Sequence, residues 1–161
     1  MMASVFDLAK YILSITDKIT TMKLQKLVYY SQAWSVTLHD EPIFDEPVRA
    51  WSDGPVVREL FLQHKGMWDI DYQHLPIGDP EVLTPQQKDI VDRVIEKYGD
   101  LDAEDLSIKT HHEDPWKNAA DIISGYAMKN YYKNLEPITK IHVTDEIKDW
   151  AKSLPLSASQ V

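Results

Sequence analysis

The 161-residue chain contains no cysteine, and this absence excludes several kinds of chemistry. Without thiols the chain cannot form disulfide bonds, bind a metal through thiolates or use a cysteine nucleophile. It also has no apolar run near the roughly 18 residues that a membrane span requires, so we expect a soluble protein. The first nine residues contain Asp7 and no basic cluster, which argues against a signal peptide. We therefore expect a cytoplasmic location.

Positive charge is also scarce, because 17 Lys and Arg residues stand against 26 Asp and Glu residues, a formal net charge of −9. Non-specific binding to nucleic acids depends on Lys and Arg side chains that neutralise phosphates, so this balance argues against it. The five glycines are scattered singly, and neither a phosphate-binding loop nor a Gly-x-Ser-x-Gly motif is present. With 43% hydrophobic and 27% charged residues, the chain should nevertheless fold into a globular structure.

The spacing of apolar residues predicts several helices. A 3.6-residue period over residues 5–16, preceded by Ser4 as N-cap, predicts the first helix. Thr20 or Thr21 begins the second, which extends to about residue 38. In both helices the apolar stripe covers about a third of the surface, as in helices that lie on a shared core. Further helical segments are predicted at 84–98, where Thr84-Pro85-Gln86-Gln87 forms a capping box, at 102–110, at Pro115-Trp116 and at 124–135.

Between the second helix and residue 83 the pattern is less regular. Residues 43–44 and 48–51 have the β-branched and aromatic content of short strands, which predicts a small β-hairpin or arm. Asp53-Gly54-Pro55 has the composition of a helix start, since proline is favoured at the first helical position, so a helix is expected from there to about Gly66. Residues 67–83 then form the longest loop.

The predicted fold class is mainly α, a single compact helical domain over residues 1–135 with a small β-hairpin or arm. Residues 136–161 are predicted to form a C-terminal appendage with an extended segment, a short amphipathic helix and a frayed tail. Thr144 would cap this helix, and Ile147 and Trp150 would lie on its apolar face.

The run His111-His112-Glu113-Asp114 is the densest group of potential metal ligands. Adjacent residues point in different directions on a helix, so a metal would need another ligand from His39, His64 or His74. The favoured alternative is structural: the histidines contact carbonyls at a helix C-terminus, and Glu113-Asp114 is the acidic cap of the next helix. We therefore expect no metal, no cofactor, no catalytic residue and no enzymatic activity. A metal-dependent enzyme that uses His111 or His112 is the alternative.

The five tryptophans and eight tyrosines indicate more about function than the titratable residues do. Trp34 and Trp116 fit core positions. Trp51, Trp68 and Trp150 fall on the arm, the long loop and the appendage, where an aromatic side chain either fixes its own segment to the body or anchors a partner. The candidate partner-binding residues are Trp51, Trp68, Ile147 and Trp150.

Lys23 and Lys26 share one flank of the second predicted helix. The ordinary interpretation is a solvated face on which the aliphatic stems of the lysines cover apolar surface. The alternative is a small positive area that docks a partner. We favour the first interpretation, because long basic side chains commonly cover apolar surface in this way.

Three segments in a fixed order carry a family resemblance. Residues 19–30 read ITTMKLQKLVYY, Ala50-Trp51 precedes Gly54-Pro55-Val56-Val57, and Thr110-His111 precedes Pro115-Trp116. They resemble the ITpxKLQKLLYY, AW…GPVV and Ls…TH…PW elements of the Panacea domain, the family of SocA-like antitoxins and phage-associated proteins. The resemblance covers about residues 5–132. The family-motif positions are Lys23, Leu24, Lys26, Leu27, Tyr29, Trp51, Gly54, Pro55, Val56, Thr110, His111, Pro115 and Trp116.

The resemblance implies an antitoxin that neutralises a cognate toxin encoded beside it, usually by direct protein–protein binding. A proteolytic adaptor that delivers the toxin to a bacterial AAA+ protease is an alternative, since one SocA-like member acts in this way. The expected partners are the toxin and, for an adaptor, the protease, without direct contact with nucleic acid or membrane. A chain of net charge −9 can be steered to a basic toxin surface. We expect the shared motifs to build the scaffold, and the variable arm, loop and tail to select the toxin.

Overall fold

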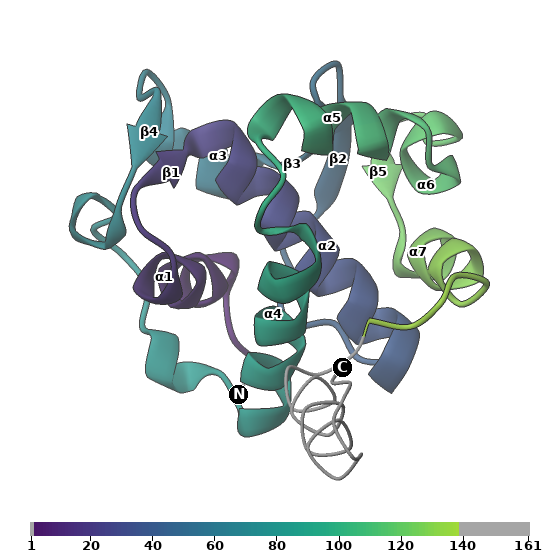
Figure 1. Cartoon of the computed structure of the whole chain (residues 1–161), viewed down its shortest axis with the longest axis horizontal. Helices are drawn as coiled ribbons and strands as arrows, with labels where there is room; N and C mark the ends of the chain where they lie inside the picture. The colour runs from purple at the N-terminus through teal and green to yellow at the C-terminus, as the bar shows by residue number, and fades with distance from the viewer. Residues whose placement is uncertain (1, 139–161) are drawn as a thin grey trace, which may run out of the picture.

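A long helix, α2 (Thr21–His39), runs through the middle of the molecule, and the other elements surround it (Figure 1). The computed structural model describes residues 2–138. Every residue of α2 from 24 to 36 is buried, against neighbours that include α7, α4 and β3. The expectation that α2 buries only about a third of its surface is therefore wrong. Several of its buried side chains are polar and are bonded to neighbouring elements, which a hydrophobic period does not detect.

The mainly helical fold predicted from the sequence is confirmed, and the helices predicted to follow Ser4, Thr20 and Thr84 begin directly after these residues. Ser4 and Thr84 each form a capping box, and Asp102 and Ser124 accept hydrogen bonds from backbone N–H groups of the first turns that follow them. The helices around α2 are α1 (Val5–Ile15), α3 (Arg58–His64), α4 (Pro85–Tyr98), α5 (Ala103–His111), α6 (Asp114–Lys117) and α7 (Gly125–Tyr132).

Two small antiparallel sheets complete the described part of the fold. In one, β1 (Ile19–Thr20) pairs with β4 (Asp69–Ile70). In the other, β2 (Val48–Trp51) lies between β3 (Gly54–Val57) and β5 (Ile122–Ile123). The predicted long loop over residues 67–83 contains β4 and the short 3-10 helices η1 (Tyr72–His74) and η2 (Pro80–Val82).

The prediction that a helix begins at Asp53-Gly54-Pro55 is wrong. Residues 54–57 form strand β3, and helix α3 begins only at Arg58. Trp51 pairs with Gly54, so Ser52 and Asp53 make the turn of a β-hairpin. Gly54 has a φ of 113°, which a residue with a Cβ rarely adopts. Pro55 is tolerated because β3 is an edge strand of its sheet.

The predicted hairpin is confirmed, with residues 48–51 as one of its strands. The prediction of a strand at residues 43–44 is wrong. Ile43 and Phe44 are buried in a loop, where their backbone N–H groups donate to Oε1 of Gln32 at 2.7 and 3.3 Å. Because a side chain of α2 satisfies these donors, the segment needs no neighbouring strand.

The predicted division between residues 1–135 and the appendage at 136–161 stays a prediction, because most of the appendage lies outside the described residues. The candidate partner-binding residues Ile147 and Trp150 lie outside them too. None of the helices in residues 2–138 combines the length and the apolar content that a bilayer crossing requires.

Candidate partner-binding site

The β2–β3 hairpin is attached to α2 by the side chain of Gln25. Its Oε1 accepts the backbone N–H of Val57 at 2.9 Å, and its Nε2 donates to the carbonyl of the same residue at 3.2 Å. The Nε2 also lies 3.0 Å from Nε2 of His64 on α3. A buried amide that satisfies both backbone groups of one strand residue fixes the position of that strand on the helix.

Gly54 is the point at which α2, the hairpin and α5 come together. A Cβ placed on Gly54 would lie 2.7 Å from Cε of Lys26 and 2.9 Å from Oγ1 of Thr110. Both distances are shorter than van der Waals contact, so the position requires glycine for space as well as for its positive φ. Three of the family-motif positions, which are far apart in the sequence, therefore meet at one contact.

Helices α5 and α6 also hold the hairpin, at its turn and at the last residue of β2. Nε2 of His111 lies 2.7 Å from the carbonyl oxygen of Ser52, and Oγ of Ser107 donates to the carbonyl of Asp53 at 2.7 Å. Nε1 of Trp116 donates to the carbonyl of Trp51 at 2.8 Å. The motif residues from α5 and α6 thus bind the main chain of the hairpin.

Lys26 is fully buried, so the prediction of a solvated face is wrong for this residue, and Lys26 is also not exposed for docking. Its Nζ has no hydrogen-bond partner among residues 2–138. Burial lowers the pKa of the Lys26 amine to about 8, although the carboxylate of Asp53 opposes this shift. Lys23 is half-buried, and its Nζ donates to the carbonyl of Gly99 at the end of α4 at 2.6 Å.

The histidines of the run 111–114 contact backbone carbonyls, as the structural interpretation predicts. Nδ1 of His111 is bonded to the carbonyl of Ser107, and Nδ1 of His112 lies 2.9 Å from the carbonyl of Ile108. Among residues 2–138, no group of three or more His, Asp or Glu side chains has the arrangement of a metal site. Because both ring nitrogens of His111 face carbonyl oxygens, this side chain is occupied in holding the fold.

The side chain of Glu113 does not act as the acidic cap that the sequence predicts for the next helix. Glu113 occupies the N-cap position of α6, but its side chain makes no capping bond and is buried. Its Oε1 accepts the hydroxyl groups of Tyr30 at 2.8 Å and Tyr132 at 2.7 Å. Burial raises the pKa of the Glu113 carboxyl, while the two tyrosine hydroxyls oppose the shift.

The tyrosines around Glu113 form a buried polar cluster that the sequence does not reveal. The hydroxyl of Tyr29 lies 3.0 Å from that of Tyr132, and Tyr30 stacks on Tyr98 with ring centroids 4.0 Å apart. Trp34 donates to the hydroxyl of Tyr98 at 2.9 Å. The tyrosine pairs at 29–30 and 131–132 are the only signal in the sequence, and it does not show which carboxylate they face.

A groove of about 680 Å³ lies beside the hairpin turn, and we call it the hairpin groove. Its walls come from the turn, the start of α2, the side chain of Trp68 and α5. Trp68 is 82% exposed and Ile108 is 52% exposed, so two large apolar side chains reach solvent at this groove. None of the described residues that line it is Lys or Arg, whereas three are acidic: Asp53, Asp102 and Glu104.

The structure places Trp51 and Trp68 in different surroundings. The ring of Trp51 is half-buried and packs edge-on against Phe61 of α3, with ring centroids 5.1 Å apart. Trp51 therefore fixes its own hairpin to the body. Trp68 leaves most of its surface free, which is the arrangement required of an anchor for a partner.

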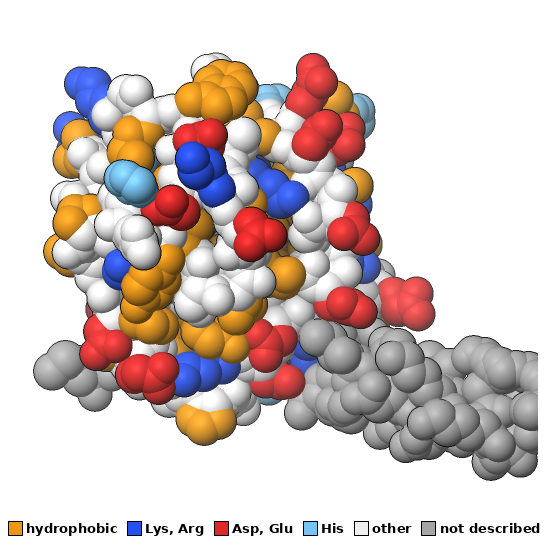
Figure 2. Space-filling view, turned by 60° about the vertical axis from the view of Figure 1, so that its left-hand side comes forward, with side chains coloured by type: hydrophobic (Ala, Val, Ile, Leu, Met, Phe, Trp, Pro, Cys, Tyr) orange, Lys and Arg blue, Asp and Glu red, His pale blue; other side chains and the backbone are white. Residues whose placement is uncertain are grey.

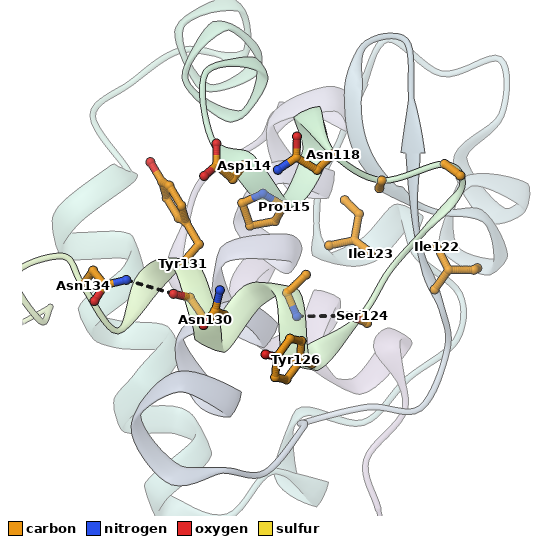
Figure 3. A pocket seen from close by; sticks show the side chains of 13 residues that line it. Asp114, Pro115, Asn118, Ile122, Ile123, Ser124, Tyr126, Asn130, Tyr131 and Asn134 are labelled. Atoms are coloured by element: carbon orange, nitrogen blue, oxygen red, sulfur yellow. Dashed lines mark hydrogen bonds between the residues drawn. The ribbon is translucent and has the colours of Figure 1, made fainter.

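A second groove, of about 470 Å³, lies between α6 and α7 and is called the α6–α7 groove (Figure 3). Asp114 and Pro115 of α6 stand on one side, and Asn130 and Tyr131 of α7 on the other. No sequence pattern indicates this groove, because its shape depends on how α6 and α7 pack on either side of the segment that contains β5.

Comparison with known proteins gives one match. A family model described as antitoxin SocA-like, Panacea domain, matches residues 24–117, more than half of the chain. The matched region extends from α2 to α6 and includes the contacts of Gln25, Gly54 and Trp116 described above. No curated protein and no solved structure matches the chain.

Proposed function

The chain belongs to the family of SocA-like antitoxins that share the Panacea domain, and we propose that it neutralises a cognate toxin by direct protein–protein binding. Family membership supports the antitoxin role. The hairpin groove supplies the observation that supports binding as the mechanism, since it presents an exposed tryptophan on the scaffold that the family-motif residues build.

Trp68 is the proposed anchor of the toxin. Tryptophan is enriched among the residues that dominate binding energy, because it buries a large apolar area and has few rotatable bonds. Ile108 lies in the same groove and adds apolar surface beside it. Burial of Trp68 by a partner would remove an exposed indole from water, a change worth about 2–4 kcal/mol at a binding hot spot.

The charge around this anchor favours a basic partner. The carboxylates of Asp53, Asp102 and Glu104 line the hairpin groove, and the chain has a net charge of −9. On the side of the molecule that carries β4 and α1, charged side chains are interspersed among hydrophobic ones (Figure 2). A basic toxin surface would be steered toward such a molecule and held beside the carboxylates of the groove.

The proposed mechanism requires no catalysis by this chain. His111 holds the hairpin turn, and Glu113 accepts two buried tyrosine hydroxyls, so both residues have structural partners. We propose that inhibition results from occupancy of the toxin surface alone.

The test is co-expression with the toxic product of the neighbouring open reading frame, followed by calorimetry on the purified pair. Wild-type protein should restore growth and bind the toxin. Trp68→Ala should weaken binding at least 10-fold and reduce rescue. Leu62→Ala is the matched control, because Leu62 is 49% exposed and lines neither groove.

Two outcomes would contradict this proposal. Equal toxin affinity of the wild type and Trp68→Ala, with both folded by circular dichroism, would exclude the hairpin groove. Loss of toxin from cells only when an AAA+ protease is present, without a stable complex in vitro, would show an adaptor instead of a sequestering antitoxin.

A further inference from the structure

Two asparagine side chains, Asn130 and Asn134, lie along one wall of the α6–α7 groove (Figure 3). Asn130 and Asn134 are four residues apart, on the same face of the chain as it leaves α7, and Tyr126 precedes them by one turn. Asn118, which follows α6, belongs to the same groove. The groove extends from Ile122 and Ile123 at one end to Asn134 at the other.

These amides are available to a ligand. The side chains of Asn118 and Asn130 have no hydrogen-bond partner within residues 2–138 and are exposed. Nδ2 of Asn134 donates to the backbone carbonyl of Asn130 at 3.0 Å, which leaves its side-chain oxygen free to accept. An amide carries donors and an acceptor side by side, so it matches the N–H and C=O groups of another polypeptide.

The spacing of the amides matches an extended chain. Asn130 lies on α7, and Asn134 lies two residues beyond Tyr132, the last residue of this helix. The backbone N–H of Asn134 donates to the carbonyl of Tyr131 at 3.2 Å, so the chain makes a further helical turn there. Side chains four residues apart along such a turn are displaced by roughly 6 Å along its axis. An extended polypeptide repeats every second residue, after about 6.6 Å. Asn130 and Asn134 can therefore contact alternate residues of one extended segment that lies along α7.

Strand β5 lies at the end of the same groove, and one of its edges is unpaired among residues 2–138. β5 pairs with β2 on one side, and no strand within residues 2–138 pairs with its other side. An unpaired strand edge presents backbone groups that a further extended segment can bind.

The remaining lining residues favour a polypeptide main chain over other ligands. Asp114 is the single charged residue among the described residues that line the groove, and none is Lys or Arg, so phosphates of a nucleic acid would find no cation there. Ala119, Ala120 and Ala127 are small and allow a backbone to come close.

We propose that the α6–α7 groove binds an extended segment of a protein partner through hydrogen bonds between its asparagine amides and the N–H and C=O groups of the partner's main chain. The segment is of low charge and adopts a strand-like conformation. This site is separate from the hairpin groove, so the inference does not depend on where the toxin binds.

The test is selection of random heptapeptides displayed on phage against the full-length protein, with counter-selection against the Asn130→Ala/Asn134→Ala double variant. Both asparagines are exposed, and the double variant loses one surface hydrogen bond, that from Nδ2 of Asn134 to the carbonyl of Asn130, so it should fold. Selected peptides should bind the double variant at least 10-fold more weakly and bind Trp68→Ala as tightly as the wild type. Methylation of alternate backbone nitrogens in the best peptide should also weaken binding at least 10-fold, because it removes main-chain donors and keeps every side chain.

The proposal is overturned if selection enriches no peptide, or only peptides that bind the double variant equally well. Undiminished binding of both N-methylated versions of the peptide, one for each alternate set of nitrogens, would show recognition of side chains and contradict it as well. Basic peptides that lose affinity to Trp68→Ala would assign peptide binding to the hairpin groove instead. A failure of Trp68→Ala to affect toxin binding would contradict the proposed function and leave this inference untouched.

Discussion

Burial of the Lys26 amine lowers the free energy of unfolding, and the carboxylate of Asp53 offsets only part of this loss. Its aliphatic chain fills the space that Gly54 leaves open, but Nζ finds no partner among residues 2–138. A charged group that is buried without a partner is destabilising, and its pKa shifts toward the neutral form. Lys26 therefore packs as an aliphatic side chain and reduces stability as a cation.

Lys26→Met should raise the free energy of unfolding at pH 7, on the order of 3 kcal/mol if the whole shift of the pKa is recovered. The wild-type amine titrates near pH 8 when folded and near its ordinary value of 10.5 when unfolded. Between these two pH values the unfolded chain binds more protons than the folded chain does, so the free energy of unfolding of the wild type should rise with pH. Urea unfolding at several pH values from 7 to 10 should show this rise in the wild type and a smaller one in the variant.

Lys26→Arg provides the control for this experiment. Arginine cannot lose its charge in this range, so the variant should be less stable than the wild type and should lack the contribution of Lys26 to the pH dependence. Equal pH dependence in all three proteins would contradict the assigned shift.

At the scale of elements, the hairpin is held by backbone contacts from three helices. Gln25 of α2, Ser107 and His111 of α5, and Trp116 of α6 each contact a main-chain group of β2, β3 or their turn. Such contacts do not depend on the side chains of the hairpin. They place Ser52 and Asp53 at the edge of the hairpin groove.

Gly54→Ala should destabilise the protein by about 2–5 kcal/mol, because the new Cβ adds strain at a positive φ and overpacks Lys26 and Thr110. Gly125→Ala is the control: at the start of α7 a Cβ would meet only Cγ1 of Val36, at an ordinary 3.8 Å. Denaturant unfolding should show a large loss for the first variant and a change within about 0.5 kcal/mol for the second. Similar losses for both would refute the packing requirement at Gly54.

Glu113 connects α6 to α2 and α7. Two variants separate its role as a hydrogen-bond acceptor from the effect of its buried charge. Glu113→Gln keeps an acceptor for both tyrosine hydroxyls and removes a buried charge, so stability at pH 7 should be unchanged or higher. Glu113→Leu leaves the hydroxyls of Tyr30 and Tyr132 without this acceptor and should cost about 2–4 kcal/mol. Thermal unfolding at pH 7 compares the two variants directly.

The pH dependence of the free energy of unfolding gives a further comparison of the wild type with the Glu113 variants. Because burial raises the pKa of Glu113, its contribution to wild-type stability should be fully present below pH 4.5 and be lost as the pH rises through the folded value. Glu113→Gln should lack this loss. A Gln variant that is as destabilised as the Leu variant would mean that the charge itself is required.

At the scale of the whole molecule, the negative charge should act on the rate of association with a basic toxin. Glu104→Lys and Glu96→Lys change the net charge equally, but only Glu104 lines the hairpin groove. We expect Glu104→Lys to lower the association rate several-fold at low salt and Glu96→Lys to lower it less, with the difference shrinking at high salt. Stopped-flow measurements at two ionic strengths would test this. Equal effects of the two variants would show that only the net charge matters.

The sequence by itself determined the features that depend on near neighbours in the chain. The capping boxes at Ser4 and Thr84, the cap at Asp102 and the helical spacing were predictable, because each involves hydrogen bonds or contacts within a few residues. The resemblance to the Panacea family was also readable from the sequence, and the family match over residues 24–117 confirms the family.

Only the tertiary structure decided which of these residues are buried and what they contact. Gly54-Pro55 is compatible with a helix start or an edge strand, and the pairing with β2 and the amide of Gln25 select the strand. Lysine is typical of protein surfaces, but Lys26 is fully buried and packs against Gly54 of the hairpin. Trp51 and Trp68 look equivalent in sequence, yet one packs on Phe61 and the other stays exposed. Burial depends on segments distant in the chain, so local patterns cannot specify it.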